Sequence, residues 1–395
     1  MDSTVVVDYG SDTLKAGLVV NFPSEQEPAV VTPSVVVAPD GSRRTAVSHG
    51  QVEDWDALES LLYYSVYDRL KWKQGEEGQL LVCEPLFTPR ADRERLTQIL
   101  FEMCNSTGVF LQDSAVLSLY AVGRLTGCVL DLGHGKIDIA PVSEGQLQTH
   151  AVTRLDICGQ DLTQCLQQKI GLESAVQISI DDAKIIKENS ACVAASSETF
   201  LELQQEKNAS DNTCSKPPSP VKHPGSPAQK PSVIAPGPGV SPQLCLPPTI
   251  TEHVLPDGNT IHVKAGTAAI LGESLFNPSV VGRGGPGLAD ACCECVLGQG
   301  DPSLRKQLVE SLLVCGGGSG MLNLTHRMFN ELQTRLPPSL QVGICGAPEY
   351  MPEKTLQFAQ WMGGAILSKV ATQHGHFVSK GEYDEIGPGA VHRKC

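Results

Sequence analysis

The sequence predicts an α/β protein with two or more domains. Three observations support this: the length of the chain, an alternation of strand and helix patterns, and two acidic turns that each follow an apolar strand. The chain has 395 residues, which is enough for several domains around a large shared core. Strands that alternate with helices favour sheets covered on both faces. The two turns, Asp8–Ser11 and Asp131–Gly135, follow the apolar runs Thr4–Val7 and Gly127–Leu130.

The segment between the two turns shows clear periodicity. Leu80–Cys83 is a short apolar run closed by Pro85, which is typical of a buried strand. Asp92–Cys104 predicts an amphipathic helix, because its apolar side chains recur at helical spacing while its charged ones face away. Ala115–Val122 predicts a second helix, which leads through Gly123 into the second acidic turn.

Two acidic glycine turns that face each other would form a phosphate clamp. Glycine allows backbone N–H groups to approach an anion closely, and an aspartate on each strand can hold a divalent metal ion through water. One such turn is a weak signal. Two copies, each at the end of a hydrophobic strand, favour a nucleotide site.

One segment interrupts the alternating pattern. Between positions 206 and 249 the chain is rich in Pro, Ser and Gly, and 11 of its 27 prolines lie between Pro217 and Pro248. Such a segment buries too little apolar surface to offset its ordering entropy, so we expect a disordered insert. A tolerated expansion of a surface loop is favoured over a docking motif at Pro217–Pro220. Order is expected to resume in a hairpin that turns at Asp257-Gly258.

Composition limits the classes of partner. A net charge of −14 argues against direct binding to nucleic acid, and no apolar run is long enough to predict a membrane span. The 14 cysteines lack the spacing of a disulfide framework and no signal peptide is recognised, so we expect reduced thiols in an intracellular protein. The Cys292–Cys295 run could suggest zinc, but buried cysteines on a helix are favoured because no second paired cluster lies at finger spacing.

Several longer segments resemble the actin family. The resemblance as a whole covers essentially everything except the proline-rich insert and the stretch between Ser34 and His49. The segments that match are 50–56, 84–94, 115–124, 383–388 and 391–395. The run 133–142, together with 348–352, is most similar to plant nuclear members of that family, which are associated with chromatin-remodelling complexes.

The resemblance implies the actin-like ATPase fold, with two ribonuclease-H-like lobes around a nucleotide cleft. Residues 1–126 and 350–395 would form the outer lobe, and residues 127–349 the inner lobe with its insert. ATP or ADP would bind with Mg²⁺ or Ca²⁺, and Asp8 and Asp131 would approach the ion through water. The residues that match the family's nucleotide contacts are Gly10, Ser11, Lys15, Gly133, Gly135, Gly159, Lys187, Glu188 and Gly317.

Three of these residues have independent support or a competing interpretation. The segment Val314–Gly320 is a strand that ends in a flexible glycine turn, which suits close backbone approach to a ligand. Lys187 and Glu188 could equally occupy a solvated helix face.

Departures from the family pattern predict weak or absent hydrolysis and no catalytic residue. Ser114 and Asp138 stand where actin positions the attacking water with a glutamine and a histidine. Asp12 replaces a glycine of the first phosphate loop, and we expect Lys15 to balance it. At ~4 Å and an effective dielectric constant of ~20, an extra negative charge beside a phosphate costs about 4 kcal/mol. Rotation of Asp12 into solvent would remove most of that cost.

The resemblance also predicts no self-filament. The segment between Ser34 and Gly50 is much shorter than the flap with which actin touches its neighbour, and Cys395 ends the chain without actin's terminal aromatic residue. The insert interrupts the opposite lobe, which also contacts filament neighbours.

A hydrophobic cleft at the base of the lobes receives partner helices throughout the family. By resemblance it is lined here by Tyr120, Ala121, Gly123, Leu125, Gly145, Leu367 and Val370, although the bare pattern of the tyrosine and leucines is also that of an ordinary core. A basic amphipathic helix from a remodeller ATPase subunit would suit the cleft and the acidic surface. A second actin-related protein or actin is a further expected partner.

These inferences predict a non-polymerising nuclear scaffold that regulates gene expression through chromatin. It would reside in the nucleus with a cytoplasmic pool, although the only basic residues that suggest import are the scattered Lys216, Lys222 and Lys230. The alternatives are a weak ATPase of the same superfamily and a cytoskeletal actin-related protein that caps or joins filaments.

Overall fold

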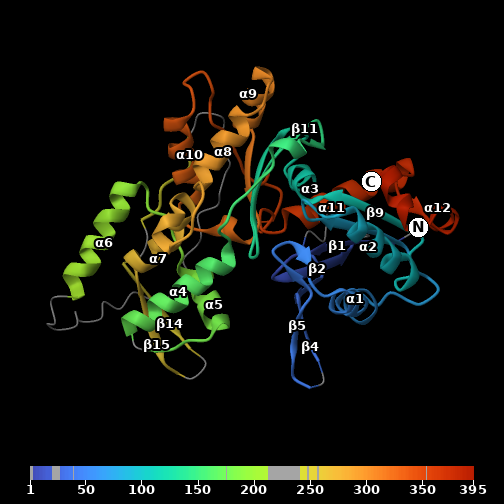
Figure 1. Ribbon diagram of the computed structural model, residues 1–395, viewed down its shortest axis with the longest axis horizontal. Helices are drawn as coiled ribbons and strands as arrows, with labels where there is room; N and C mark the ends of the chain where they lie inside the picture. Colours follow the sequence, from blue (N-terminus) through green and yellow to red (C-terminus); the bar gives the residue numbers. More distant parts are fainter. Residues whose placement is uncertain are drawn as a thin grey trace.

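The structure is a computed structural model. It describes residues 3–19, 27–38, 40–174, 176–211, 241–246, 249–255, 258–352 and 354–395. Figure 1 shows two groups of elements, one around β1, β2 and α1 with both chain ends, the other around α4, α7 and α8.

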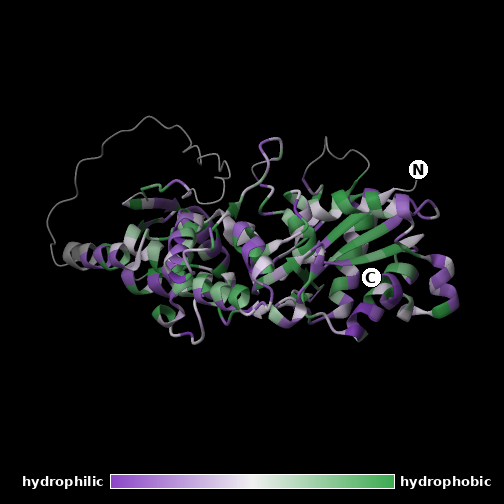
Figure 2. Ribbon diagram, turned by 90° about the horizontal axis from the view of Figure 1, so that it is seen from above, coloured by the Kyte–Doolittle hydropathy of each residue, from purple (hydrophilic) through white to green (hydrophobic). Residues whose placement is uncertain are grey.

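The first sheet is built on a hairpin followed by two parallel strands. Its spatial order is β18-β9-β8-β1-β2-β3. β1 pairs antiparallel with β2 and parallel with β8, and β8 pairs parallel with β9. The strands are β1 (Thr4–Tyr9), β2 (Thr13–Leu18), β3 (Val30–Pro33), β8 (Gln79–Glu84), β9 (Gly108–Asp113) and β18 (Val378–Ser379). Figure 2 shows hydrophobic strands on the side of the molecule that carries both chain ends.

The second sheet repeats this plan. β10 pairs antiparallel with β11 and parallel with β16, which in turn pairs parallel with β17. The strands are β10 (Gly127–Leu132), β11 (Ile137–Ser143), β12 (Gln146–Leu147), β13 (Thr153–Arg154), β16 (Leu312–Cys315) and β17 (Ile344–Cys345). Each sheet therefore presents one acidic hairpin, β1–β2 in the first and β10–β11 in the second.

The remaining strands of the described residues form short two-stranded sheets. They are β4 (Val35–Val37) with β5 (Arg43–Thr45), β6 (Val47–Ser48) with β7 (Gln51–Val52), and β14 (Ile250–Val254) with β15 (Thr260–Lys264). The β14–β15 hairpin confirms the turn predicted there, and Gly258 adopts φ +86°. Pro256 and Asp257 lie outside the described residues.

Helices cover the sheets. They are α1 (Trp55–Tyr63), α2 (Arg90–Glu102), α3 (Ser114–Ala121), α4 (Gly159–Ser174), α5 (Ile180–Ser190), α6 (Ser197–Asp211), α7 (Ala265–Phe276), α8 (Leu288–Leu297), α9 (Pro302–Glu310), α10 (Leu324–Arg335), α11 (Ala359–His374), α12 (Lys380–Ile386) and α13 (Val391–Lys394). A π-helical stretch, Tyr64–Arg69, extends α1. Short 3₁₀ turns occupy Thr149–Ala151, Pro278–Val281, Gly317–Gly320 and Pro388–Ala390.

The cores explain why the two sheets form one molecule. One buried cluster packs under the first sheet and another under the second. A third lies between them and combines side chains of β1 and β8 with those of β10 and β16, through α3 and α11. Trp361 of α11 is fully buried there and donates a hydrogen bond to the Val6 carbonyl oxygen at 3.1 Å. The base of the molecule is therefore packed like a protein interior.

The predicted elements are confirmed, with shifted boundaries. α2 begins at Arg90 because Pro89 precedes it in an extended conformation, and α3 begins one residue earlier than expected. Cys292, Cys293 and Cys295 are buried in α8, as the favoured interpretation predicts.

The proline-rich insert begins later than predicted. α6 continues to Asp211, because residues 202–207 are Glu, Leu, Gln, Gln, Glu and Lys, all good helix formers. Residues 212–240, 247 and 248 lie outside the described residues. Before β14 the chain is fixed on α10, where Asn323 Nδ2 donates to the Cys245 carbonyl oxygen at 2.8 Å and Cys245 N donates to Asn323 Oδ1 at 2.9 Å.

Glu84, at the end of β8, predicts a pH dependence of stability. It is 3% exposed, and its Oε1 lies 2.9 Å from Arg93 Nε without good hydrogen-bond alignment. Burial raises its pKa from 4.5 to about 7, with a contribution from Asp113 and opposition from Arg93. Between pH 4.5 and 7 the unfolded chain loses a proton that the folded protein keeps, so the free energy of unfolding falls as pH rises.

We expect Glu84→Gln to remove this slope. In urea denaturation, the difference in the free energy of unfolding between pH 5 and pH 7.5 should shrink by up to about 3 kcal/mol relative to the unmodified protein. Glu382→Gln is the control: hydrogen bonds from Lys394 and Ser379 lower the pKa of Glu382 to about 2, outside that window. It should lower stability equally at both pH values. An unchanged slope in Glu84→Gln would contradict the assignment.

Candidate functional site

The two acidic hairpins meet where the sheets face each other. Gly10 N donates to the Thr13 carbonyl oxygen at 3.1 Å, which closes the first turn, and Gly133 N donates to the Lys136 carbonyl oxygen at 2.8 Å, which closes the second. The loops touch, because a Cβ added to Gly135 would lie 2.5 Å from Ser11 Oγ.

Asp8 and Asp131 are both buried and both already have partners. Lys15 Nζ donates to Asp8 Oδ2 at 2.9 Å, and Gln360 Nε2 of α11 donates to Asp131 Oδ2 at 2.9 Å. Burial raises the pKa of Asp131, while Lys136 opposes the rise and the negative charge of Asp8 adds to it. Burial alone would lower the pKa of Lys15, but attraction to Asp8 outweighs it and the pKa is raised.

A divalent ion fits the donor chemistry of these two residues. Carboxylate oxygens from opposite hairpins are the ligands that Mg²⁺ and Ca²⁺ prefer. The turn after β16 leaves room beside them only as glycine: Gly316 adopts φ +85°, and a Cβ there would lie 2.6 Å from Asp131 Oδ1.

The prediction that Lys15 balances Asp12 is wrong. Lys15 pairs with Asp8. Lys184 of α5 pairs with Asp12 instead, and its Nζ lies 2.7 Å from Asp12 Oδ2. Asp12 therefore holds an ion pair across the cleft and does not rotate into solvent. The physical reason is the approach of α5 to the first acidic hairpin, which no local sequence pattern indicates.

Asp138, at the position where the resemblance implies a histidine, is enclosed by cations. It is 0% exposed, and Lys136 Nζ donates to its Oδ2 at 2.7 Å. Arg154 grips it in a bidentate pair, Nε to Oδ1 at 2.6 Å and Nη2 to Oδ2 at 3.0 Å. Burial alone would raise the pKa of Asp138, but Lys136 and Arg154 together lower it. The carboxylate is thus ionised, and both its oxygens are engaged.

Arg154 also joins the two lobes. Its Nη2 donates to the Leu86 carbonyl oxygen at 3.2 Å, and its Nη1 lies 3.5 Å from the His49 carbonyl oxygen. The guanidinium stacks over the Phe87 ring, 5.1 Å from the centroid. On the other side of the same contact, His49 Nδ1 lies 2.9 Å from the Gly135 carbonyl oxygen.

The residues predicted to contact the nucleoside differ in their surroundings. Gly159 N donates to the Gly133 carbonyl oxygen at 3.1 Å, so it lies beside the second acidic hairpin. Lys187 Nζ donates to the Gly159 carbonyl oxygen at 2.9 Å and to Thr163 Oγ1 at 2.7 Å, which is not a solvated position. Glu188 is exposed. A Cβ added to Gly317 would meet no atom within 4 Å, which is consistent with room for a ligand.

Ser114, the second departure, is buried at the start of α3. Its carbonyl oxygen accepts a hydrogen bond from Ser118 Oγ at 2.8 Å, a local helix contact. A hydroxymethyl side chain on a buried helix start is too short to reach a water as a glutamine would.

Only some of the residues predicted to line the partner cleft are exposed or in contact with one another. Tyr120 and Gly145 are in contact, since a Cβ on Gly145 would lie 2.7 Å from the tyrosine hydroxyl. Leu125 is 61% and Val370 48% exposed, and both are available to a partner. Gly123 is exposed and Leu367 half-buried against the central core. Ala121 is a correction: at 2% exposed it belongs to the core, because it faces inward from α3.

Sequence reasoning missed Arg154, Lys184 and Gln360. Arg154 lies directly opposite Asp138 in the β11–β13 pairing, so the signal is strand register, which a single sequence does not display. Lys184 and Gln360 reach the cleft from α5 and α11, far along the chain.

Comparison with known proteins agrees with this architecture. The family model described as "Actin" matches residues 1–395. Actin-related protein 7 of Oryza sativa subsp. indica is 38% identical over 406 aligned residues, which span 99% of each chain. The chain belongs to the actin family. Actin-related protein 7 of Arabidopsis thaliana is 34% identical over 407 aligned residues, again 99% of each chain. The resemblance noted in the sequence is therefore confirmed, and so is the actin-like fold.

In the described residues of this actin-family chain, no helix has both the length and the apolarity that crossing a membrane requires.

Proposed function

We propose that this protein is a nuclear, non-polymerising actin-related protein that acts as a structural subunit of a chromatin-remodelling complex. The observation that carries the proposal is the state of Asp138. Three hydrogen bonds from Lys136 and Arg154 engage both oxygens of this carboxylate, and its pKa is lowered, which makes it a weak general base. The position that activates water in the family serves here to hold the lobes together.

Nucleotide, if bound, is a structural ligand in this proposal. Asp8 and Asp131 would hold Mg²⁺ or Ca²⁺ through water, and the loops at Gly10–Ser11 and Gly133–Gly135 would supply N–H groups to the phosphates. The ion supplies charge neutralisation for those phosphates. Lys187 and Gly317 lie at positions that suit the nucleoside, the first near Gly159 and the second in open space.

The short flap supports the absence of self-filaments. β4 and β5 contribute three residues each. Arg44 Nε lies 2.6 Å from Asp54 Oδ2, and Arg43 Nη2 lies 3.9 Å from Asp181 Oδ2 of α5, across the cleft. A flap of this size offers little surface to a neighbouring subunit.

Partner binding would use the cleft around Tyr120, Leu125 and Val370. Exposed apolar side chains beside α3 and α11 suit an amphipathic helix laid in a groove. The net charge of −14 favours a basic helix and makes association salt-sensitive. A helix of a remodeller ATPase subunit is the proposed occupant, with a second actin-related protein or actin as a further member of the complex.

Purification of the tagged endogenous protein from nuclei tests this function. We expect a stoichiometric complex that contains a remodeller ATPase, and we expect Leu125→Asp to release the protein from it while the fold is retained. Recovery mainly with cytoskeletal proteins from the cytoplasmic fraction would favour the alternative, an actin-related protein that caps or joins filaments.

A further inference from the structure

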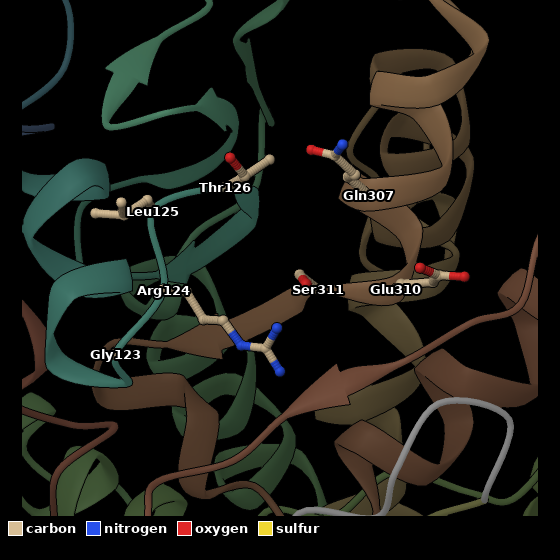
Figure 3. A pocket seen from close by; sticks show the side chains of 7 residues that line it. All are labelled: Gly123, Arg124, Leu125, Thr126, Gln307, Glu310 and Ser311. Atoms are coloured by element: carbon tan, nitrogen blue, oxygen red, sulfur yellow. The ribbon is translucent and has the colours of Figure 1, made fainter.

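A pocket of about 340 Å³ lies next to the proposed partner cleft and apart from the acidic hairpins. One wall is the loop that follows α3, and the other is the end of α9 with the first turn into β16 (Figure 3). Its lining residues are Gly123, Arg124, Leu125, Thr126, Gln307, Glu310 and Ser311. Two of them, Gly123 and Leu125, also belong to the predicted cleft, so a partner in the cleft passes the mouth of the pocket.

Arg124 is the main cation of this pocket, and its charge is unmatched. Its guanidinium forms no ion pair and no side-chain hydrogen bond with any residue in the described ranges. Figure 3 shows the side chain extending from the loop toward the wall that carries Ser311. On the opposite wall Glu310 is different, because Lys306 Nζ lies 3.8 Å from its Oε1. The pocket therefore offers one unpaired positive charge in a molecule whose net charge is −14.

The loop that carries Arg124 is fixed by backbone hydrogen bonds. Gly123 adopts φ +71° and ends α3, and Arg124 N donates to the Leu119 carbonyl oxygen at 2.9 Å. On the far side, Gly145 N donates to the Leu125 carbonyl oxygen at 2.7 Å. A guanidinium on a fixed backbone loses less entropy on binding than one on a mobile loop.

We propose that this pocket receives one aspartate or glutamate side chain of the helix that occupies the partner cleft, an inference that rests on the proposed function. The carboxylate would accept two hydrogen bonds from Arg124, the geometry in which arginine binds carboxylates best. The exposed Leu125 at the mouth would contact an apolar residue beside the acid.

The contact between Arg124 and the partner's carboxylate would fix the position of the partner helix along the cleft, because of its charge. A predominantly basic helix is attracted to the acidic surface at many positions, whereas an acidic residue of that helix is favoured at the cleft beside the unpaired Arg124. The carboxylate at Arg124 would therefore fix how far along the groove the helix lies. Glu310 on the opposite wall disfavours a second acid in the same pocket.

Site-specific cross-linking in the complex purified from nuclei tests the proposal. A photo-cross-linking residue in place of Gln307 samples the far wall of the pocket and leaves Arg124 intact. We expect a single cross-linked partner peptide with an aspartate or glutamate within one helical turn of the attachment point. Arg124→Met should reduce the cross-link at least about tenfold, the loss expected for a charged hydrogen-bonded pair. Arg393→Met, an exposed arginine near the end of the chain, is the matched control.

A charge exchange completes the test. Arg124→Glu should abolish the cross-link, and replacement of the identified partner acid by arginine should restore it. A cross-linked peptide without a nearby acid, an unchanged yield in Arg124→Met, or no cross-link in an intact complex would each overturn the proposal. Failure to recover a remodeller complex would instead refute the proposed function, since that outcome is scored before cross-linking.

Discussion

Replacing Asp138 with asparagine is expected to lower the free energy of unfolding by about 3–5 kcal/mol, the usual cost of removing one partner from a buried ion pair. The substitution keeps the shape of the side chain but removes the buried negative charge that pairs with the half-buried Lys136 and Arg154. Asp131 then remains beside Lys136, with its Oδ2 3.7 Å from Lys136 Nζ. Urea or guanidinium denaturation measures the loss directly.

The same substitution should also loosen the contact between the lobes. Arg154 loses the carboxylate that fixes its guanidinium, so its bonds to the Leu86 and His49 carbonyl oxygens weaken. Hydrogen exchange should therefore rise in the peptides that contain these residues, and Arg154→Met should give the same pattern. Asp384→Asn is the control, because its exposed pair with Lys380 contributes less than about 1 kcal/mol. A cost for Asp138→Asn as small as the control's, with unchanged exchange, would contradict the role given to Asp138.

The second large effect concerns Arg327 on α10, which ties three helices together. It is 1% exposed, and its Nη1 donates to Glu273 Oε2 of α7 at 3.0 Å. Its Nε donates to Glu331 Oε1 at 2.6 Å, and its Nη2 donates to Ser197 Oγ of α6 at 2.9 Å. The guanidinium also stacks over the Phe276 ring at 4.8 Å.

We expect Arg327→Met to cost about 3–5 kcal/mol, because Glu273 is left as an uncompensated buried charge. The double variant Arg327→Met, Glu273→Met should recover a large part of that loss, since both charges are then absent. Arg43→Met provides the comparison: its exposed pair with Asp181 should contribute less than about 1 kcal/mol. If the single and double variants were equally unstable, packing rather than charge would account for the loss.

The sequence predicts well what is local. Each acidic hairpin is encoded within about ten residues by an apolar strand, an aspartate and a glycine turn, so β1–β2 and β10–β11 could be anticipated. The ends of the helices were predicted less accurately. The helix α2 begins directly after Pro89, earlier than predicted, and strong helix formers extend α6 into the predicted insert.

The charge network of the cleft could not be predicted, because it is made by register and by tertiary approach. Asp138 meets Arg154 through strand pairing, and Asp12 meets Lys184 from a position 172 residues away. Sequence reasoning therefore identified Asp12 and Asp138 as departures from the family but assigned Asp12 the wrong partner. The structure changes their meaning from unbalanced negative charges to anchors between the lobes.

We propose that the cleft of this actin-family protein does not activate water for ATP hydrolysis. Phosphate release from Mg·ATP by the purified chain, measured beside actin at equal concentration, tests it most directly. We expect a rate at least about 100-fold below that of actin, the lower limit for loss of a positioned general base. We also expect Ser114→Gln alone to leave the rate low, because both oxygens of Asp138 stay bound to Lys136 and Arg154. Phosphate release at the rate of actin would show that the cleft does activate water and would contradict the proposed loss of hydrolysis.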